Sequence, residues 1–195
     1  MALFLPAFDR TVLGNEGPYD NDPKDPGGET VWGITRKYQA SWPGWFIIDA
    51  VPPDKRAAFS AEQGRIEASP LNACIKSFYN NGPWAGIRGN EIPDQAIAEE
   101  LFDSAVNCGV VTAVKWLQRA LNIFNLQGLD YPDIEVDGYF GQQTLECLVQ
   151  FYAKRGPDIM LKALDAQQGM HYMQIAEKNP NLEKFEAGWW TRRIG

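Results

Sequence analysis

The stretch EGPYDNDPKDPGGETVWGIT, from Glu16 to Thr35, decides the fold because it places a turn-rich, β-prone loop in a largely helical sequence. Glu16 closes an apolar-periodic segment that predicts a short helix, with apolar residues at Leu5, Phe8, Val12 and Leu13. Its carboxyl group is therefore expected at a helix end beside half-apolar surroundings. Such surroundings favour the protonated form of a carboxyl group, which suits a proton donor.

A second carboxylate, Asp25, lies in the same stretch. The residues Pro26, Gly27 and Gly28 force the chain to turn sharply there, so the Asp25 side chain is expected to stay hydrated and ionised. Two carboxyl groups in unlike environments can share the work of glycoside cleavage. One protonates the leaving oxygen, and the other supports water or the oxocarbenium ion. The stretch therefore predicts a glycosidase.

Each of these residues also has a purely structural interpretation. Glu16 could be a helix-end acid, although the helix macrodipole disfavours a negative charge at a C-terminal end. Asp25 could be an Asx-turn former, and Asp22 is its rival because it too precedes a proline. Thr30 begins a β-prone run, so its hydroxyl group could be an ordinary strand-surface group.

The stretch resembles the signature of the glycoside hydrolase 108 family, in which EGGY is followed by DPxDxGGxT and then GIT. These are N-acetylmuramidases of phage endolysins and secretion-associated lysozymes. It is also similar to the Glu, Asp and Thr arrangement of phage-type lysozymes, with Glu16, Asp25 and Thr30 at the corresponding positions. The resemblance implies that Glu16 is the general acid, Asp25 the base or electrostatic partner, and Thr30 the residue that holds the water. It implies cleavage of the β-1,4 bond between N-acetylmuramic acid and N-acetylglucosamine, with no cofactor.

Three segments further along the chain resemble parts of the same family. FDSAVNCG, at residues 102–109, is similar to a helix-ending element in which Asn107 lines the sugar cleft. The alternative is a helix C-cap at Gly109 with Asn107 satisfying free carbonyl groups, and both roles can hold together. LQRALN at 117–122 and VDGYFGQQT at 136–144 resemble a peptidoglycan-binding helical module. The alternative is that they only complete one helical globule, because no flexible linker precedes them.

Aromatic residues near these motifs are candidates for sugar contacts. Sugar sites need flat apolar faces beside a few hydrogen-bonding groups. Tyr19 and Trp32 flank the proposed carboxylates, and Trp84 is the third candidate for substrate binding. Trp189 and Trp190 are more typical of packing residues.

Composition points to a folded enzyme and argues against a nucleic-acid-binding site and a metal site. The chain has 195 residues, is 45% hydrophobic and 22% charged, and can bury a substantial core. A net charge of −7 without clustered Lys and Arg excludes a nucleic-acid partner. A single histidine and three scattered cysteines predict no metal site and no disulfide frame. The residues from Asp133 to Thr144 fit a calcium loop poorly, because Thr144 stands where a glutamate is required.

The sequence also predicts where the protein acts. No stretch approaches the roughly 20 apolar residues of a membrane-spanning helix. The start, MALFLPAFDR, has no early positive charge and is broken by Pro6 and Asp9, so it does not resemble a secretory signal. We expect a monomer that is made in the cytoplasm and acts on the cell wall in the periplasm after release, as a phage endolysin does.

Taken together, the motifs predict a mainly α, lysozyme-like (α+β) fold, with a small β-hairpin lobe around residues 19–35 facing a helical lobe across a cleft. Residues 42–53 are expected to be a connection, and a long helix is expected over residues 157–177. A catalytic part over 1–95 and a binding-module-like helical part over 96–195 are expected to pack into one globule. The partner is the peptidoglycan glycan strand. Two alternatives to the hydrolase are a lytic transglycosylase and a non-catalytic wall-binding or secretion-helper protein.

Overall fold

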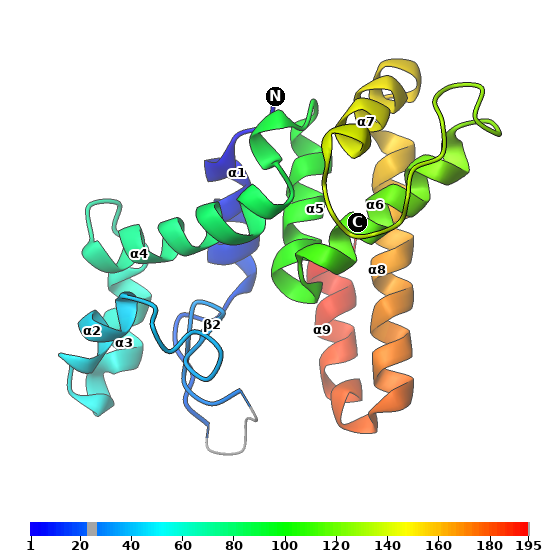
Figure 1. The fold of residues 1–195 in the computed structure, drawn as a ribbon. Coiled ribbons are helices and arrows are strands. Elements are labelled where there is room, and N and C mark those ends of the chain that lie inside the picture. The colour runs from blue at the N-terminus through cyan, green and yellow to red at the C-terminus, as the bar shows by residue number, and fades with distance from the viewer. Residues whose placement is uncertain (23–26, 195) are drawn as a thin grey trace. The chain divides into compact units, whose positions relative to one another are not determined.

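The computed structural model describes residues 1–22 and 27–194, and the described chain is mainly helical with one small antiparallel hairpin (Figure 1). This confirms the mainly α fold with a β-hairpin that the sequence predicts. The chain forms two compact units. One comprises Phe8–Gly82, and the other joins the N-terminal segment Met1–Ala7 to Pro83–Gly195.

The Phe8–Gly82 unit carries the hairpin. Strand β1 (Thr30–Val31) pairs antiparallel with β2 (Ile34–Thr35), with Thr30 opposite Thr35. Both residues of the connecting turn have positive φ, 47° at Trp32 and 79° at Gly33, which is the geometry of the two-residue turns that match strand twist. The other elements of this unit are the π-helix η1 (Asp9–Leu13), α2 (Gly44–Asp49), η2 (Pro53–Lys55), α3 (Arg56–Gln63) and α4 (Pro70–Tyr79).

Helix α2 lies within residues 42–53, where the sequence predicts a connection, so that prediction is wrong. The helix is only six residues long, and it is held by packing because Trp45 and Ile48 are buried. Helix α4, by contrast, has a strong local start signal. The hydroxyl group of Ser69 accepts a hydrogen bond from the Leu71 N–H, and Pro70 occupies the first helical position.

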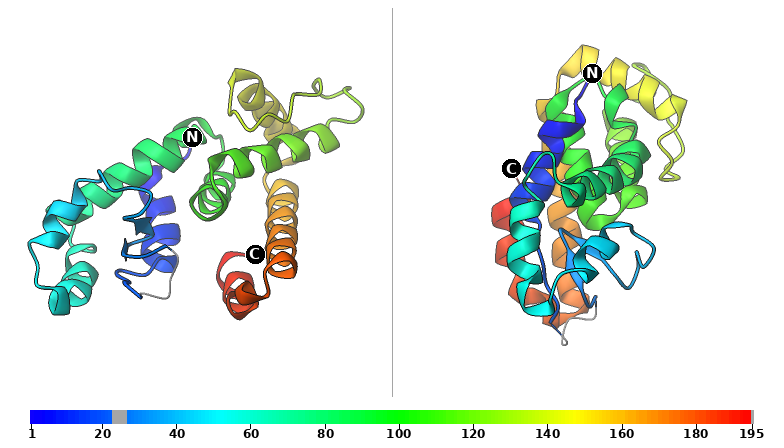
Figure 2. Two further views of the ribbon diagram at one scale, coloured as in Figure 1. Left: turned by 60° about the horizontal axis from the view of Figure 1, so that its bottom comes forward. Right: turned by 90° about the vertical axis from the view of Figure 1, so that its left-hand side faces the viewer.

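The second unit is built from long helices: α5 (Gln95–Cys108), α6 (Val110–Phe124), α7 (Gln142–Arg155), α8 (Asp158–Lys178) and α9 (Glu183–Arg193). Shorter elements are η4 (Gly89–Glu91) and η5 (Pro180–Leu182). Two more, α1 (Phe4–Phe8) and η3 (Asn80–Trp84), are shared, because Phe8 and residues 80–82 belong to the other unit. Asp94 caps α5, and Gly109, at φ 87°, separates α5 from α6. The C-cap predicted at Gly109 is thereby confirmed. Helix α8 confirms the long helix predicted over residues 157–177. Figure 2 shows α9 folding back along α8.

The core of this second unit lies between α5, α6, α7 and α8. An aromatic cluster joins α1 to α5, because the rings of Phe4, Trp84 and Phe102 lie with centroids 5.6–6.0 Å apart. Cys74, Cys108 and Cys147 are free thiols, and burial raises the pKa of Cys108 to about 12. Over residues 1–22 and 27–194, no helix is both long and apolar enough to cross a membrane.

Candidate active site

Glu16 lies at the end of the first helical segment, where its N–H donates to the Val12 carbonyl oxygen at 3.0 Å. Its half-buried side chain reaches the hairpin turn. A Cβ atom on Gly33 would stand 2.8 Å from Oε2 of Glu16 and 2.6 Å from the hydroxyl oxygen of Tyr79. Tyr79 in turn donates to the Trp32 carbonyl oxygen at 2.6 Å. The Glu16 carboxyl group at the helix end and the Tyr79 hydroxyl group of α4 therefore both lie against the hairpin turn at Gly33.

The loop that carries the second candidate carboxylate is fixed at both ends. The Asp20 N–H donates to the Thr30 carbonyl oxygen at 2.9 Å, and the Thr30 N–H donates back to Asp20 at 2.8 Å. Asp25 itself lies outside the described residues. The hydroxyl group of Thr30 donates to the Gly28 carbonyl oxygen at 3.1 Å, so towards a water molecule it would act as an acceptor. Its predicted role in holding water stays a prediction.

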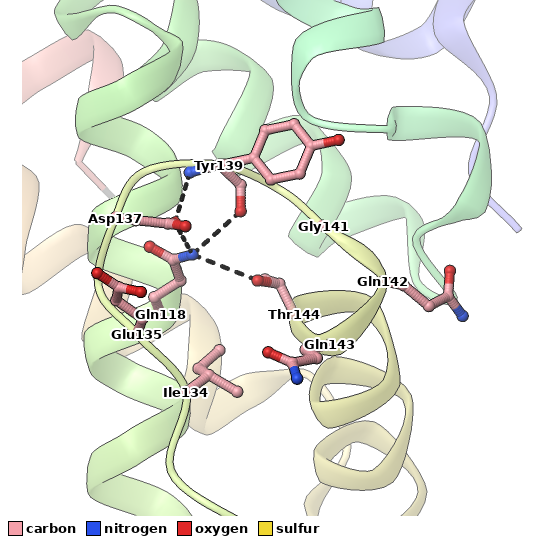
Figure 3. Close-up of a pocket in the computed structure, with 9 residues that line it drawn as sticks. All are labelled: Gln118, Ile134, Glu135, Asp137, Tyr139, Gly141, Gln142, Gln143 and Thr144. Carbon is pink, nitrogen blue, oxygen red and sulfur yellow. Dashed lines mark hydrogen bonds between the residues drawn. The ribbon is translucent and has the colours of Figure 1, made fainter.

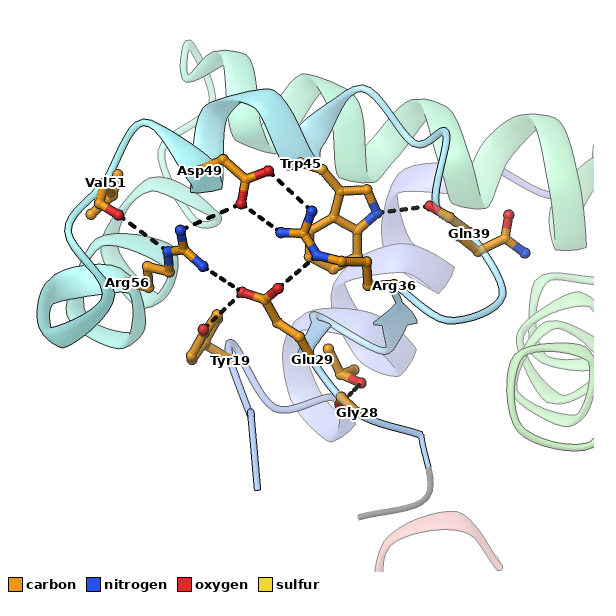
Figure 4. Close-up of polar contacts among 10 residues, drawn as sticks. Tyr19, Gly28, Glu29, Arg36, Gln39, Trp45, Asp49, Val51 and Arg56 are labelled. Atoms are coloured by element: carbon orange, nitrogen blue, oxygen red, sulfur yellow. Dashed lines mark hydrogen bonds and ion pairs between the residues drawn. The ribbon is translucent and has the colours of Figure 1, made fainter. Parts of the chain in front are cut away.

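A charged cluster beside the hairpin was not predicted (Figure 4). Glu29, whose side chain is only 12% exposed, accepts from Arg36 at 2.6 Å, from Arg56 at 3.0 Å and from the Tyr19 hydroxyl group at 2.8 Å. Arg36 also forms a bidentate ion pair with Asp49, with N–O distances of 2.7 and 3.0 Å. We call these five residues the Glu29 cluster.

The Glu29 cluster ties the hairpin to α2 and α3. Asp49 ends α2, Arg56 begins α3, and Arg36 lies over the Trp45 ring at 4.1 Å. Hydrogen bonds from Arg36 lower the pKa of Asp49, while burial and the bond to Glu29 raise the pKa of Tyr19. The sequence carries little signal for this cluster. Tyr19 is predicted only as a sugar contact, and Glu29 lies in the Glu16–Thr35 stretch, but Asp49 and Arg56 are remote in the chain and no motif links them to the stretch.

The predicted sugar-contacting tryptophans are buried. The Trp32 indole donates to the Ser60 carbonyl oxygen at 3.1 Å and lies against Gly64, where a Cβ would stand 2.1 Å from its nitrogen. Trp84 donates to the Asn90 side chain at 2.9 Å. In contrast to the sequence expectation, neither ring has an exposed face on which a sugar could stack. Tyr19 is only partly buried, although its hydroxyl group belongs to the Glu29 cluster.

Asn107 lies on α5 in the other compact unit and donates from its side chain to the Tyr172 hydroxyl group. Nearby, Arg193 pairs with Asp103 at 2.7 Å, and Gln168 donates to Tyr172 at 3.0 Å. Asn107 is therefore part of a partly buried polar network that joins α5, α8 and α9. Its predicted contact with substrate stays a prediction.

The second unit contains a pocket of about 270 Å³ between α6 and the start of α7 (Figure 3). Gln118, on α6, is buried and organises its wall. Its side-chain nitrogen donates to Asp137 at 2.8 Å, to the Tyr139 carbonyl oxygen at 3.1 Å and to the Thr144 hydroxyl oxygen at 3.3 Å. Its side-chain oxygen accepts from the Gly138 N–H at 2.9 Å. Gln118 belongs to LQRALN and the other residues to VDGYFGQQT, so the two motifs meet here.

No group of histidine, cysteine and acidic side chains within residues 1–22 and 27–194 is arranged to hold a metal ion. The residues that would have formed a calcium loop instead form this pocket wall. The Asp137 carboxylate accepts from the Tyr139 N–H at 2.8 Å, and this bond, with that from Gln118, lowers the pKa of Asp137.

Comparison with known proteins identifies both parts of the chain. The glycosyl hydrolase 108 model matches residues 10–109, and a model described as a predicted peptidoglycan domain matches residues 112–194. The class of protein is therefore a glycoside hydrolase of peptidoglycan with a C-terminal peptidoglycan-binding domain. The chain belongs to the glycosyl hydrolase 108 family, as its motifs indicated.

The structure of SagA from Brucella abortus is similar to this chain, with a TM-score of 0.62 and 23% sequence identity over 97% of this chain and 88% of that one. This likeness shows a shared fold. No curated protein sequence matches the chain. The first family match ends at Gly109, whereas the compact units divide between Gly82 and Pro83. The division into 1–95 and 96–195 stays a prediction.

Proposed function

We propose that the protein is an N-acetylmuramidase that cleaves the β-1,4 bond between N-acetylmuramic acid and N-acetylglucosamine, with Glu16 as the general acid. The observation that carries this proposal is the position of the Glu16 carboxyl group, half-buried and lying against Gly33 at the hairpin turn, where the Tyr79 hydroxyl group also lies. A carboxyl group fixed in this way can protonate the leaving glycosidic oxygen, provided that the sugar binds beside the hairpin turn.

The second half of the reaction requires a carboxylate that supports water or the oxocarbenium ion, and we assign this role to Asp25 with Thr30 as the water-holding residue. The paired residues Asp20 and Thr30 close the loop in which Asp25 occurs. The Thr30 hydroxyl group donates to Gly28 and also lies 3.4 Å from the Thr35 hydroxyl oxygen, and a water molecule would use the acceptor capacity that remains on the Thr30 oxygen. Both assignments rest on the motif and on the fixed ends of the loop.

The Glu29 cluster gives the hairpin the rigidity that such a reaction needs. Catalytic groups lose much of their effect when they move by about 1 Å, so a catalytic hairpin must be held by its neighbours. Glu29 lies directly before Thr30 and is held by two arginines, Arg36 after the hairpin and Arg56 at the start of α3. We assign it a positioning role.

In this proposal the protein acts as a monomer on wall glycan, after release from the cytoplasm. The reaction needs only protein side chains and water. The deciding experiment is an end-group analysis of digested peptidoglycan. After borohydride reduction and mass spectrometry, muramidase action leaves reduced N-acetylmuramic acid at the new ends. Reduced N-acetylglucosamine would place the cut at the other glycosidic bond. A 1,6-anhydro end would establish a lytic transglycosylase, and intact strands would establish a non-catalytic wall-binding protein.

A further inference from the structure

The pocket between α6 and α7 is a separate binding site, and we propose that it holds one neutral N-acetylated sugar of the glycan strand and not the acidic stem peptide. This inference rests on the proposed function in one respect, namely that the ligand comes from peptidoglycan. The choice of sugar over peptide comes from the charge, size and shape of the pocket.

The pocket is preformed because its wall is fixed by buried hydrogen bonds. Gln118 uses both ends of its side-chain amide to hold Asp137, Gly138 and Thr144. Gly138 has a φ of 83°, and a Cβ there would stand 2.6 Å from the Val111 side chain. Such a wall needs little ordering when a ligand binds, which favours recognition of a small ligand.

The charges around the pocket argue against an anionic ligand and do not build a dedicated cation site. The exposed carboxylates of Glu135 and Asp137 line it and disfavour an anion such as the carboxylate-rich stem peptide. The N-terminal end of the 14-residue helix α7 also faces it, and the macrodipole there disfavours a cation. Arg88 donates to Gln142 at 3.2 Å, but its charge is already paired with Glu91 and adds little to that positive side. A neutral ligand is disfavoured neither by the two carboxylates nor by the N-terminal end of α7.

The hydrogen-bonding groups of the pocket suit an acetamido sugar. In the described part of the chain no side chain caps the first turn of α7, whose N-cap residue is Gly141, so its backbone N–H groups are available to a ligand oxygen. The exposed amide of Gln143 can both donate and accept. Sugar hydroxyl groups and the acetamido group offer the same mixture of donors and acceptors.

Shape and size limit the ligand to about one sugar ring. A volume of about 270 Å³ lies just below the roughly 300–1,000 Å³ typical of pockets for drug-sized molecules. Tyr139, 74% exposed, provides a flat apolar face at this site. Its ring can lie over Gly141 because that residue has no side chain; a Cβ there would be 3.2 Å from the ring. A single ring can stack on Tyr139 while the rest of the strand passes out of the pocket.

The test uses full-length, isotope-labelled protein carrying Glu16→Gln, so that the glycan is not cleaved. Chitotriose, a neutral N-acetylglucosamine trimer, is titrated in one NMR experiment, and the free acidic stem peptide in another. We expect saturable shifts of the backbone amides at 139–144 with chitotriose and none with the peptide. Shifts with the peptide alone, or no shifts at these amides with either probe, would overturn the proposal.

Two substitutions sharpen the result. Tyr139→Ala should weaken chitotriose binding at the pocket about tenfold, the effect of one lost stacking face. Tyr38→Ala is the matched control, because Tyr38 is 71% exposed but lies in the other compact unit. Equal effects of both substitutions would contradict the assignment. The end-group analysis of wild-type digests is independent of this titration, so the muramidase proposal and the pocket proposal can fail separately.

Discussion

The Oε2 atom of Glu16 lies so close to the α-carbon of Gly33 that a Cβ there would stand only 2.8 Å away. The same Cβ would meet the Tyr79 hydroxyl oxygen at 2.6 Å. Glycine at the second turn position thus serves two purposes. It adopts the positive φ that the hairpin turn requires, and it leaves room for the proposed acid.

Gly33→Ala should therefore reduce glycan cleavage by about a hundredfold, because the new methyl group displaces the Glu16 carboxyl group. The measurement is the initial rate of turbidity clearing on purified peptidoglycan. Gly28→Ala is the matched control, since Gly28 also has a positive φ, 71°, but no atom of residues 1–22 or 27–194 lies within 4 Å of its Cβ position. Both substitutions carry the cost of left-handed backbone, about 1 kcal/mol. Equal losses of activity would show that backbone strain, and not the clash, is responsible.

Glu16→Gln should abolish wall lysis, with a drop of roughly a thousandfold or more, while the melting temperature stays close to that of the wild type. The amide keeps the shape of the side chain but cannot deliver a proton. Glu67→Gln provides the control, because Glu67 is an exposed acid of the same unit, paired with Lys76 at 2.5 Å. If the Glu16 variant cleared peptidoglycan at a near wild-type rate, another residue would be the acid.

Asp25→Asn should cost more activity than Asp22→Asn, as only Asp25 matches the second carboxylate of the motif. Asparagine preserves an Asx turn at either position, so the comparison separates chemistry from turn formation. Clearing rates of the two variants, measured side by side, decide the matter. A larger loss at Asp22 would transfer the second role to that residue.

Glu29→Gln should destabilise the Phe8–Gly82 unit by roughly 1–3 kcal/mol, because two arginines lose their shared carboxylate in a half-buried place. Cleavage should fall as well, since the hairpin loses its anchor. Hydrogen exchange, followed separately in the two units, measures the first effect.

Asp130→Asn is the control for that substitution. Asp130 is also 12% exposed and pairs with two cations, Lys154 and Arg155, each at 2.6 Å, but it lies in the other unit. It should alter exchange in that unit and leave the cleavage rate near wild type. Similar losses of cleavage in both variants would remove the positioning role of Glu29.

Deleting residues 133–195 should yield an insoluble or partly unfolded product. The deletion removes α7, α8 and α9, and with them the buried side chains of Phe151, Met160 and Leu164, which form a core with α5 and α6. Circular dichroism and a thermal melt of the fragment test this. A soluble fragment that melts cooperatively and still cleaves glycan would show that the C-terminal part is an independent module and that the chain is not one globule.

The sequence by itself determined the family, the class of reaction and most helices. Gly109 between two apolar-periodic runs predicted the break between α5 and α6, and the periodic run after Pro157 predicted α8. These signals are local, since caps, periodicity and glycine at positive φ act between residues a few positions apart. The hairpin was likewise predicted, from the turn residues Pro26, Gly27 and Gly28 beside the β-prone run that begins at Thr30.

Only the tertiary structure decided which side chains meet. Helix α2 was missed because its six residues carry no capping signal and are held by the burial of Trp45 and Ile48. The Glu29 cluster joins residues from Tyr19 to Arg56, and no local pattern pairs charges over such separations. Trp32 and Trp84 have the flat aromatic side chains that sugar sites use, yet both are buried. Whether an aromatic ring packs or faces solvent depends on the neighbours that folding brings to it, and those contacts exist only in the folded chain.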